Sequence, residues 1–453
     1  MFDLSQALAI IIFLAMFLVI IAGKTHRYVP ALIGAGFTVG LVYLFAMRSP
    51  HAALGVFNLG ELGRSSFWLP GREPFHSHGL NWQPIIFIAG MMVMVEGMAE
   101  TGFFKWLCLS VAKLVNYRIL PLFVGFILLS GLMSMFIDSI TVLLFMATVT
   151  IELARLLKFD PVPLIIAIIF AANTGGAASM SGDPPNIIIG TAFGYSFLDF
   201  LLNIGLIAWI SLAVPLLIFF IVIRKKFKGS GNVVQNLELG QLHPGKAITN
   251  KYLFAANVAV FFVLIVLLVT HAQSGLSVAT IGVIAGTLTL VVARKKSLGI
   301  IKKIDWRSLV FFAGLFIVVN GLEETGVLKT LAGYIGTVSK GNITVAITII
   351  LWLSAFSSAI VDNIPFAATM VPVISGLSQA GGFPLPPLAW ALSLGTDIGG
   401  NGTPIGASAN VVGTAIAERE GHRIGWGRFL KYGMPGMILA ISISWILLMV
   451  KYA

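Results

Sequence analysis

The chain repeats a set of residues at one constant offset. Identical residues stand 224 positions apart in the pairs Trp82 and Trp306, Gly90 and Gly314, Gly97 and Gly321, Glu100 and Glu324, Thr101 and Thr325, Gly102 and Gly326, Asp138 and Asp362, Gly175 and Gly399, Gly176 and Gly400, Gly182 and Gly406, and Asn186 and Asn410. Chance gives a few matches in a glycine-rich sequence, but not an ungapped series over more than a hundred residues. The chain is therefore a duplicated unit.

Composition places this unit in a membrane. Of 453 residues, 58% are hydrophobic and only 10% are charged, which is too few charges to cover the surface of a soluble protein. Uncharged stretches at 5–23, 30–47, 252–270 and 277–293 each have the length of a bilayer-crossing helix. Their apolar residues are continuous and do not alternate, which excludes a barrel. The sequence predicts an all-α polytopic membrane protein.

The residue types that carry enzyme chemistry are scarce. The single cysteine, Cys108, excludes a disulfide scaffold, a cysteine-based zinc site and an iron–sulfur cluster. The seven histidines include no His-x-x-x-His pair, and no nucleophile–base pair stands out. We therefore predict no catalytic residues, no cofactor and no protein-bound metal, and we disfavour an enzyme.

Basic residues indicate the topology. Six short segments hold 23 of the 29 Lys and Arg residues: 24–27, 105–118, 155–158, 224–251, 294–307 and 419–431. If these segments are cytoplasmic, the stretches between them alternate consistently across the membrane. The net charge of +11 then reports topology and contact with anionic lipid, and nucleic-acid binding is a poor second reading.

The number of crossings sets the orientation of the second copy. In the first half we expect spans at 5–23, 30–47, 83–102, a broken one across 161–196, and 198–223. Five crossings is an odd number, so the second copy enters the membrane from the opposite face. Inverted-topology repeats are typical of secondary transporters, whose sites lie near the midplane between the copies.

The same reasoning divides the chain into three parts. Residues 1–224 form the first inverted repeat, residues 225–251 a cytoplasmic linker, and residues 252–453 the second inverted repeat. We expect five transmembrane helices in each repeat.

Two stretches per repeat do not read as ordinary spans. Residues 119–157 and 341–378 each have two apolar limbs around a polar tip that contains Asp138 or Asp362. Basic residues at both outer ends of the first stretch favour a re-entrant hairpin, although two complete spans satisfy the same charges. The other pair, 173–186 and 397–410, contains Gly-Gly and Pro, which break a helix. Broken backbone at membrane depth is tolerated where it is buried in protein or lines a wet cavity.

These motifs resemble the ArsB/NhaD branch of the ion transporter superfamily. The similarity lies in Phe136-Ile137-Asp138-Ser139, Gly182-Asp183-Pro184-Pro185-Asn186, Asp362-Asn363-Ile364-Pro365-Phe366 and the glycine-rich run 399–410, and it extends over residues 84–430. The melanosomal P protein is also similar, particularly at 362–370 and 399–410. The resemblance implies the fold of the divalent-anion/sodium symporters, with two inverted five-span repeats, two re-entrant hairpins and two unwound helices.

In such relatives the hairpin tips and unwound loops form the substrate and ion sites. The resemblance implies that role here for Asp138, Ser139, Asn173, Thr174, Asp183, Asn186, Asp362, Asn363, Asp397, Asn401, Thr403 and Asn410. Ser139 departs from the Asn that often follows the hairpin acid, which predicts one altered half-site. An ionisable residue inside an apolar span is a functional candidate because its burial is costly. The plainer alternative is that a carboxylate caps the start of a half-helix, which we expect of Asp362 and Asp183, and such capping is compatible with ligand binding.

The predicted site contains carboxylates, amides and hydroxyls but no Lys or Arg, so a dicarboxylate would be repelled unless bound cations offset its charge. Arsenite and antimonite are neutral trihydroxides near pH 7, and hydroxyl groups bond to carboxylates and amides. We therefore predict a plasma-membrane (inner-membrane) secondary transporter that exports arsenite or antimonite in exchange for protons. The alternatives are a sodium/proton antiporter, an inorganic or organic anion permease of the same superfamily, and a channel.

Partners follow from this hypothesis. We expect arsenite or antimonite, protons and membrane lipid, and no nucleic acid. An arsenical pump-driving ATPase and a second copy of the chain are candidate protein partners on which the sequence does not decide.

The charge asymmetry makes a direct prediction of topology. Both termini should face the periplasm and residues 225–251 the cytoplasm. In a C108S background, a cysteine introduced as S230C should react with an impermeant maleimide only after the membrane is opened. Labelling of intact cells at this position would overturn the assignment.

Overall fold

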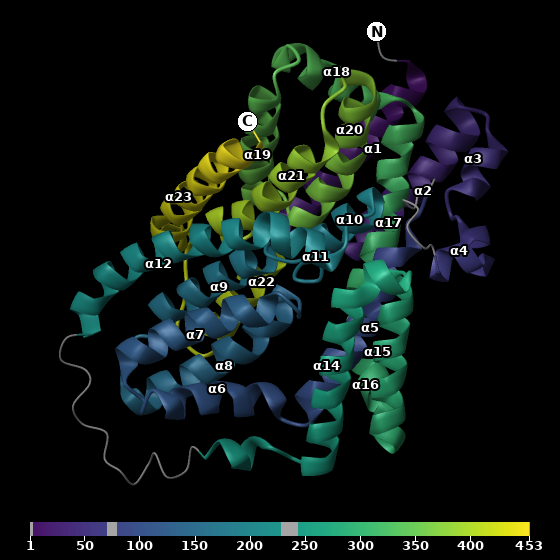
Figure 1. The fold of residues 1–453 in the computed structure, drawn as a ribbon. Helices are drawn as coiled ribbons and strands as arrows, with labels where there is room; N and C mark the ends of the chain where they lie inside the picture. Colours follow the sequence, from purple (N-terminus) through teal and green to yellow (C-terminus); the bar gives the residue numbers. More distant parts are fainter. Residues whose placement is uncertain (1–2, 70–78, 228–242, 453) are drawn as a thin grey trace.

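The computed structural model describes residues 3–69, 79–227 and 243–452, and all regular structure in these ranges is helical (Figure 1). The first-repeat elements are α1 (Leu4–Ala22), α2 (Tyr28–Phe37) with its π-helical continuation (Thr38–Ala46), α3 (Pro50–Gly55), the 3₁₀ turn Leu59–Gly63, α4 (Ser65–Trp68), α5 (Trp82–Glu100), α6 (Phe103–Leu114), α7 (Ile119–Ser134), α8 (Ser139–Leu157), α9 (Val162–Gly176), α10 (Pro184–Phe193), α11 (Phe197–Phe200), a π-helical turn (Leu201–Gly205) and α12 (Leu206–Phe227).

The second half begins with the 3₁₀ turn Pro244–Ala247 and continues with α14 (Lys251–Ser274), α15 (Val278–Ala293), the 3₁₀ turn Arg294–Lys296, α16 (Ser297–Lys303), α17 (Trp306–Glu324), α18 (Val327–Ser339), α19 (Ile343–Ile360), α20 (Asn363–Gly381), α21 (Leu385–Gly399), the 3₁₀ turn Gly400–Gly402, α22 (Ser408–Arg419) and α23 (Trp426–Tyr452).

The duplication seen in the sequence is also present in the helix boundaries. Helices α5 and α17 begin and end 224 residues apart, and so do α8 and α20. Gly102 and Gly326, which end the third span of each repeat, both have a positive φ, of 82° and 79°. In Figure 1 the amphipathic helices α6 and α18 lie at opposite ends of the molecule, as inverted copies require. The predicted fold class, an all-α polytopic membrane protein of two inverted repeats, is confirmed.

The two repeats are intertwined. Helix α5 of the first repeat packs most extensively on α15 of the second, and α17 of the second repeat packs on α2 of the first. Glycines allow both approaches: a Cβ on Gly90 would lie 2.0 Å from the Gly282 carbonyl oxygen, and one on Gly314 would lie 2.8 Å from the Ala31 carbonyl carbon. The close approach of backbones through small residues is the usual way membrane helices associate.

Among the described residues, ten helical segments are long and apolar enough to cross a membrane. Six of them coincide with the stretches predicted at 5–23, 30–47, 83–102, 198–223, 252–270 and 277–293. Two more, α17 and α23, belong to the five spans expected of the second repeat, and the other two, α8 and α19, are limbs of the predicted hairpins. The remaining two predicted spans are the broken pairs α9–α10 and α21–α22.

The hairpin tips decide between re-entrant loops and complete spans. Asp138 between α7 and α8 and Asp362 between α19 and α20 line one and the same cavity. Inverted hairpins that each crossed the whole bilayer would place their tips at opposite membrane faces. Tips that meet inside the protein therefore identify α7–α8 and α19–α20 as re-entrant hairpins, with backbone at membrane depth facing a cavity.

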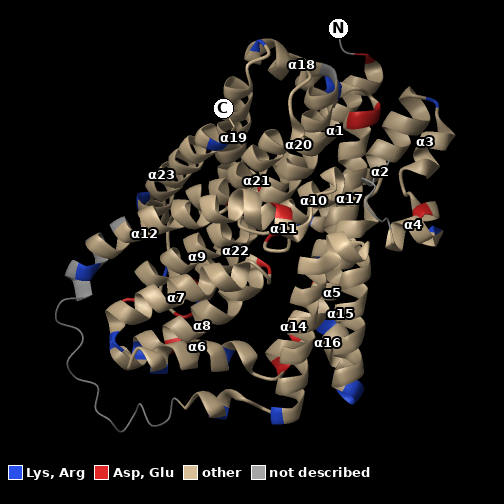
Figure 2. Cartoon of the chain, in the orientation of Figure 1, with Lys and Arg blue, Asp and Glu red and all other residues tan. Residues whose placement is uncertain are grey.

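The predicted linker at 225–251 is described only at its ends, since residues 228–242 lie outside the described residues. The turn Pro244–Ala247 packs against α6, and the Thr249 hydroxyl donates a 3.0 Å hydrogen bond to the Glu100 carbonyl oxygen. In Figure 2, Lys and Arg gather along α6, at the end of α12 and at the start of α14, on the side where the linker joins the two halves.

The broken helices pack tightly on the hairpins. A Cβ on Gly175 would lie 2.4 Å from the Gly131 carbonyl oxygen, and one on Gly399 would lie 2.5 Å from the Ala355 Cα. We therefore expect G175A and G399A each to destabilise the protein by about 1–3 kcal/mol, because rigid backbone cannot move aside. The measurement is the thermal midpoint of the detergent-solubilised protein. G36A in α2, where a Cβ meets nothing within 4 Å, is the matched control and should not lower the midpoint.

Candidate functional site

Each hairpin tip ends in a carboxylate that caps the following helix. Asp138 accepts hydrogen bonds from the backbone N–H and hydroxyl of Thr141, at 3.0 and 2.8 Å. Asp362 accepts one from the Ile364 N–H at 3.2 Å. The capping predicted for Asp362 is present, and Asp138 caps α8 in the same way. The capping predicted for Asp183 is wrong, because its side chain makes no capping hydrogen bond to α10.

The unwound loops bind the hairpin tips by equivalent hydrogen bonds. The Ser179 hydroxyl donates to the Met135 carbonyl oxygen, and Thr403, at the same offset of 224, donates to the Ala359 carbonyl oxygen. Within each loop the side-chain amide of Asn186 or Asn410 donates to two main-chain carbonyl groups. These bonds satisfy the carbonyl groups that the helix breaks leave without a partner.

The two loops are also joined to each other. The Asn173 amide donates to the side-chain oxygens of Asn401 and Asn410 at 3.0 and 2.8 Å, and the Asn401 amide donates to the Thr174 hydroxyl at 3.1 Å. All four side chains are buried. This asparagine network holds the first repeat against the second where both helices are broken.

Two further carboxylates are deeply buried beside this network. One oxygen of Asp183 accepts a 2.7 Å hydrogen bond from the Ser139 hydroxyl, and one oxygen of Asp397 accepts a 3.5 Å bond from the Asn363 amide. In each case the second oxygen, Oδ2, is buried and finds no hydrogen-bond partner among the described residues. Such an oxygen is a candidate position for a proton or a cation.

A cavity of about 550 Å³ lies between these elements. Its lining includes five of the predicted site residues, namely Asp138, Ser139, Asp183, Asp362 and Asn363. The other seven are outside this lining: Asn173, Thr174, Asn186, Asp397, Asn401, Thr403 and Asn410 are buried in and around the loops. The structure therefore brings the predicted residues together in two groups, one facing the cavity and one supporting it.

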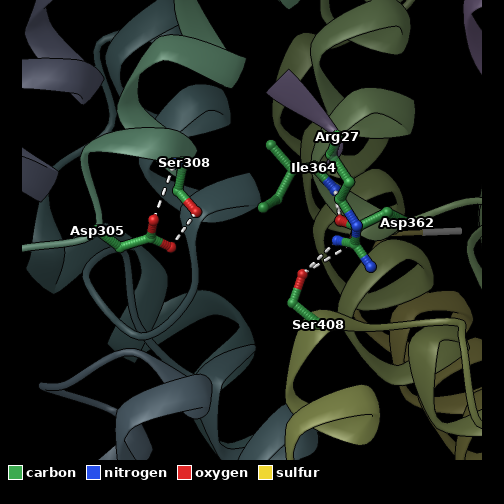
Figure 3. Close-up of polar contacts among 6 residues, drawn as sticks. All are labelled: Arg27, Asp305, Ser308, Asp362, Ile364 and Ser408. Carbon is green, nitrogen blue, oxygen red and sulfur yellow. Dashed lines mark hydrogen bonds and ion pairs between the residues drawn. The ribbon is translucent and has the colours of Figure 1, made fainter. Parts of the chain in front are cut away.

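The prediction that the site contains no Lys or Arg is wrong. Arg27, from the connection between α1 and α2, forms an ion pair with Asp362, and its Nη1 donates to the Ser408 hydroxyl at 2.6 Å (Figure 3). In the sequence, Arg27 belongs to the basic segment 24–27 that indicates topology. The buried acid required a counter-charge somewhere, but nothing in the spacing named Arg27, because the two residues are 335 positions apart.

The border of the cavity adds more polar groups. Arg307 Nη1 lies 3.1 Å from His26 Nε2, and Asp305 accepts from the Ser308 N–H at 3.2 Å. Figure 3 shows Asp305 and Ser308 across from Arg27 and Asp362. His26, Asp305 and Arg307 come from the 24–27 and 294–307 segments, which the charge distribution predicts to be cytoplasmic.

Helix starts converge on the same space. The first residues of five helices line the cavity: Tyr28 of α2, Ser139 of α8, Pro184 of α10, Asn363 of α20 and Ser408 of α22. Each helix N-terminus carries a partial positive charge of roughly half a unit. The cavity thus has dipole ends that attract an anion in addition to its carboxylates.

Inverted repeats, broken helices and a shared internal cavity define a membrane transporter. Comparison with known proteins leads to the same class, a membrane transporter. Residues 16–395 match the CitMHS family, described as citrate transporter. The chain belongs to this family, which supports the ion transporter superfamily predicted from the motifs, while the ArsB/NhaD branch stays a prediction.

Proteins similar to this chain include some that are named as transporters. The chain is 32% identical over 453 residues to a protein of Mycobacterium bovis called an uncharacterized transporter, with 99% of both chains covered. It is 27% identical to the human P protein over 93% of this chain and 60% of that one. The fold is similar to the Alcanivorax borkumensis YdaH transporter (TM-score 0.56, 14% identity, 82% and 85% coverage) and to Neisseria gonorrhoeae MtrF (0.55, 14%, 100% and 96%).

The buried carboxylates predict where coupling can be lost. D183N and D397N keep the side-chain shape but remove a site for a proton or cation, so each should abolish gradient-driven transport by this protein or reduce it roughly tenfold or more. Flux of the transported substrate in proteoliposomes, at matched protein content, is the measurement. D160N, which removes an exposed partner of Arg428, is the matched control and should transport normally. Normal transport by both buried variants would contradict this role.

Proposed function

We propose that this protein is a proton-coupled secondary transporter of the plasma membrane whose substrate is a small polycarboxylate of the citrate type. The single observation that carries the proposal is Arg27, a guanidinium at the cavity beside Asp362 and Ser408. Arginine is the side chain best suited to carboxylate recognition, because its planar fork matches the two oxygens.

The electrostatics of the cavity favours an anionic substrate more strongly than the predicted side chains alone do. Five helix N-termini face the cavity and add positive partial charge where the sequence predicted only carboxylates and neutral groups. The description of the family as citrate transporter supports the same substrate class.

The acidic side chains explain why such an anion would need cations. Asp138, Asp183, Asp305 and Asp362 line the cavity, against Arg27 and Arg307. A polycarboxylate would bind favourably only when protons or other cations neutralise part of this charge. The second oxygens of Asp183 and Asp397 are suitable proton positions, since no described residue bonds to them. Coupling to protons is then a condition for binding and not an added feature.

The second candidate is export of arsenite or antimonite in exchange for protons. It is favoured by the hydroxyl, amide and carboxylate groups of Ser139, Asn363 and Asp183, which can bond to a neutral trihydroxide without any charge penalty. It ranks second because the sequence favours a neutral substrate only if the site contains no Lys or Arg. Arg27, paired with Asp362, shows that the site does contain a basic residue.

The two candidates differ in a flux experiment. Purified protein in proteoliposomes with an acidic exterior should accumulate labelled citrate above its external concentration, and a protonophore should abolish the accumulation. Labelled arsenite and sodium are tested in parallel under both directions of the pH gradient, with D183N as the inactive reference. Proton-driven accumulation of arsenite without citrate flux would favour the second candidate. Sodium accumulation driven by protons moving in the opposite direction would indicate a sodium/proton antiporter. Substrate flux that only follows the substrate's own gradient would indicate a channel.

A further inference from the structure

The pair formed by Arg27 and Asp362 joins two separate parts of the fold. Arg27 is the residue before α2, which packs with α1 and α17, whereas Asp362 is the tip of the hairpin α19–α20. The Asp362 side chain is 3% exposed and that of Arg27 is 33% exposed. The ion pair therefore has one partly exposed and one almost fully buried member, and both line the cavity.

Only one nitrogen of the Arg27 guanidinium bonds to described residues. Both of its bonds, to Asp362 and to Ser408, are made by Nη1. Within the described residues, Nη2 and Nε donate to no other side chain or carbonyl group. This leaves the Nη2–Nε edge, which can bind a carboxylate through two parallel hydrogen bonds, without a described partner in a residue that lines the cavity.

We propose that Arg27 is the residue that binds a carboxylate of the substrate, and that Asp362 is an internal competitor which releases Arg27 when it takes up a proton. This inference rests on the proposed function and adds the coupling residues to it. In the substrate-free protein the Asp362 carboxylate neutralises the guanidinium. One proton on Asp362 leaves a neutral hydrogen-bond partner, and the substrate carboxylate then becomes the counter-charge. Loss of that proton restores the ion pair and expels the substrate.

Other charged groups line the same cavity, and their effects on binding must be distinguished from the effect of Asp362. Asp138 and Asp183 lie on the first repeat's hairpin tip and loop, His26 precedes Arg27, and Asp305 and Arg307 border α17. None of these is an ion-pair partner of Arg27 among the described residues. Ser408, which bonds to both Arg27 and Asp362, keeps the two side chains in register and carries no charge of its own.

The role can be distinguished from a merely structural ion pair by an asymmetry between its two members. If the pair only holds the fold together, R27Q and D362N should be equally harmful, and the neutral double variant R27Q/D362N should recover. If Arg27 binds the substrate, D362N should retain citrate binding, R27Q should lose it, and the double variant should resemble R27Q. R27K, which keeps the charge and loses the fork, should fall between.

The experiment measures labelled-citrate binding and counterflow between pH 5.5 and 8 for wild type and these variants, with monodispersity checked by size-exclusion chromatography. We expect R27Q and the double variant to weaken citrate affinity roughly 30-fold or more. At pH 8, D362N should bind citrate with the affinity that wild type has at acidic pH. It should show no proton-driven accumulation of citrate. Because citrate itself titrates in this range, the readout is the ratio of each variant to wild type. K24Q, in the same connection, is the charge-matched control, and H26N separates the contribution of the imidazole.

Each outcome bears on the proposal. Unchanged citrate affinity in R27Q, or recovery in the double variant, overturns the role of Arg27 while the proposed function stands. If D362N keeps the wild-type pH dependence and H26N loses it, Asp362 is not the competitor. Failure of wild type itself to bind or carry citrate overturns the proposed function, and with it this inference. The two failures are distinguishable because the first appears only in the variants.

Discussion

The fold depends on how two interrupted helices are satisfied inside a membrane protein. Each break exposes main-chain carbonyl groups, and lipid offers them no partner. Here the partners are Asn186 and Asn410 within each loop, and Ser179 and Thr403 toward the hairpins. Because the Asn173 amide bonds to Asn401 and Asn410, neither loop is complete without the other repeat. The need to pair broken backbone therefore brings the two halves together and places the site between them.

Charge compensation follows from that arrangement. Unwinding creates new helix starts at α10 and α22, and the hairpins add those of α8 and α20. These positive dipole ends surround carboxylates that would otherwise be buried without compensation. Asp362 has in addition a full counter-charge in Arg27, whereas Asp183 and Asp397 each keep one oxygen free of described partners. The repeats are thus similar in backbone and different in charge.

The asymmetry is visible residue by residue. At the offset of 224, Asp183 corresponds to Ala407 and Asp397 corresponds to Asn173, so each repeat contributes one buried acid from a different position. Ser139 corresponds to Asn363, and each bonds to the acid of its own repeat. A symmetric scaffold with unlike side chains suits a transporter, since equivalent backbones in the two repeats can present the cavity to either side of the membrane.

The sequence by itself determined the membrane location, the duplication, its inversion and the positions of the breaks. These depend on composition, on an odd number of crossings and on Gly and Pro, all of which act locally along the chain. It also named twelve residues that the fold gathers around one cavity and its supporting loops. Only the tertiary structure decided which of them face the cavity, how the third span of each repeat packs on the other, and that Arg27 meets Asp362. Contacts between residues hundreds of positions apart depend on packing geometry, and a basic residue at a helix start looks the same in sequence whether it faces lipid headgroups or a buried acid.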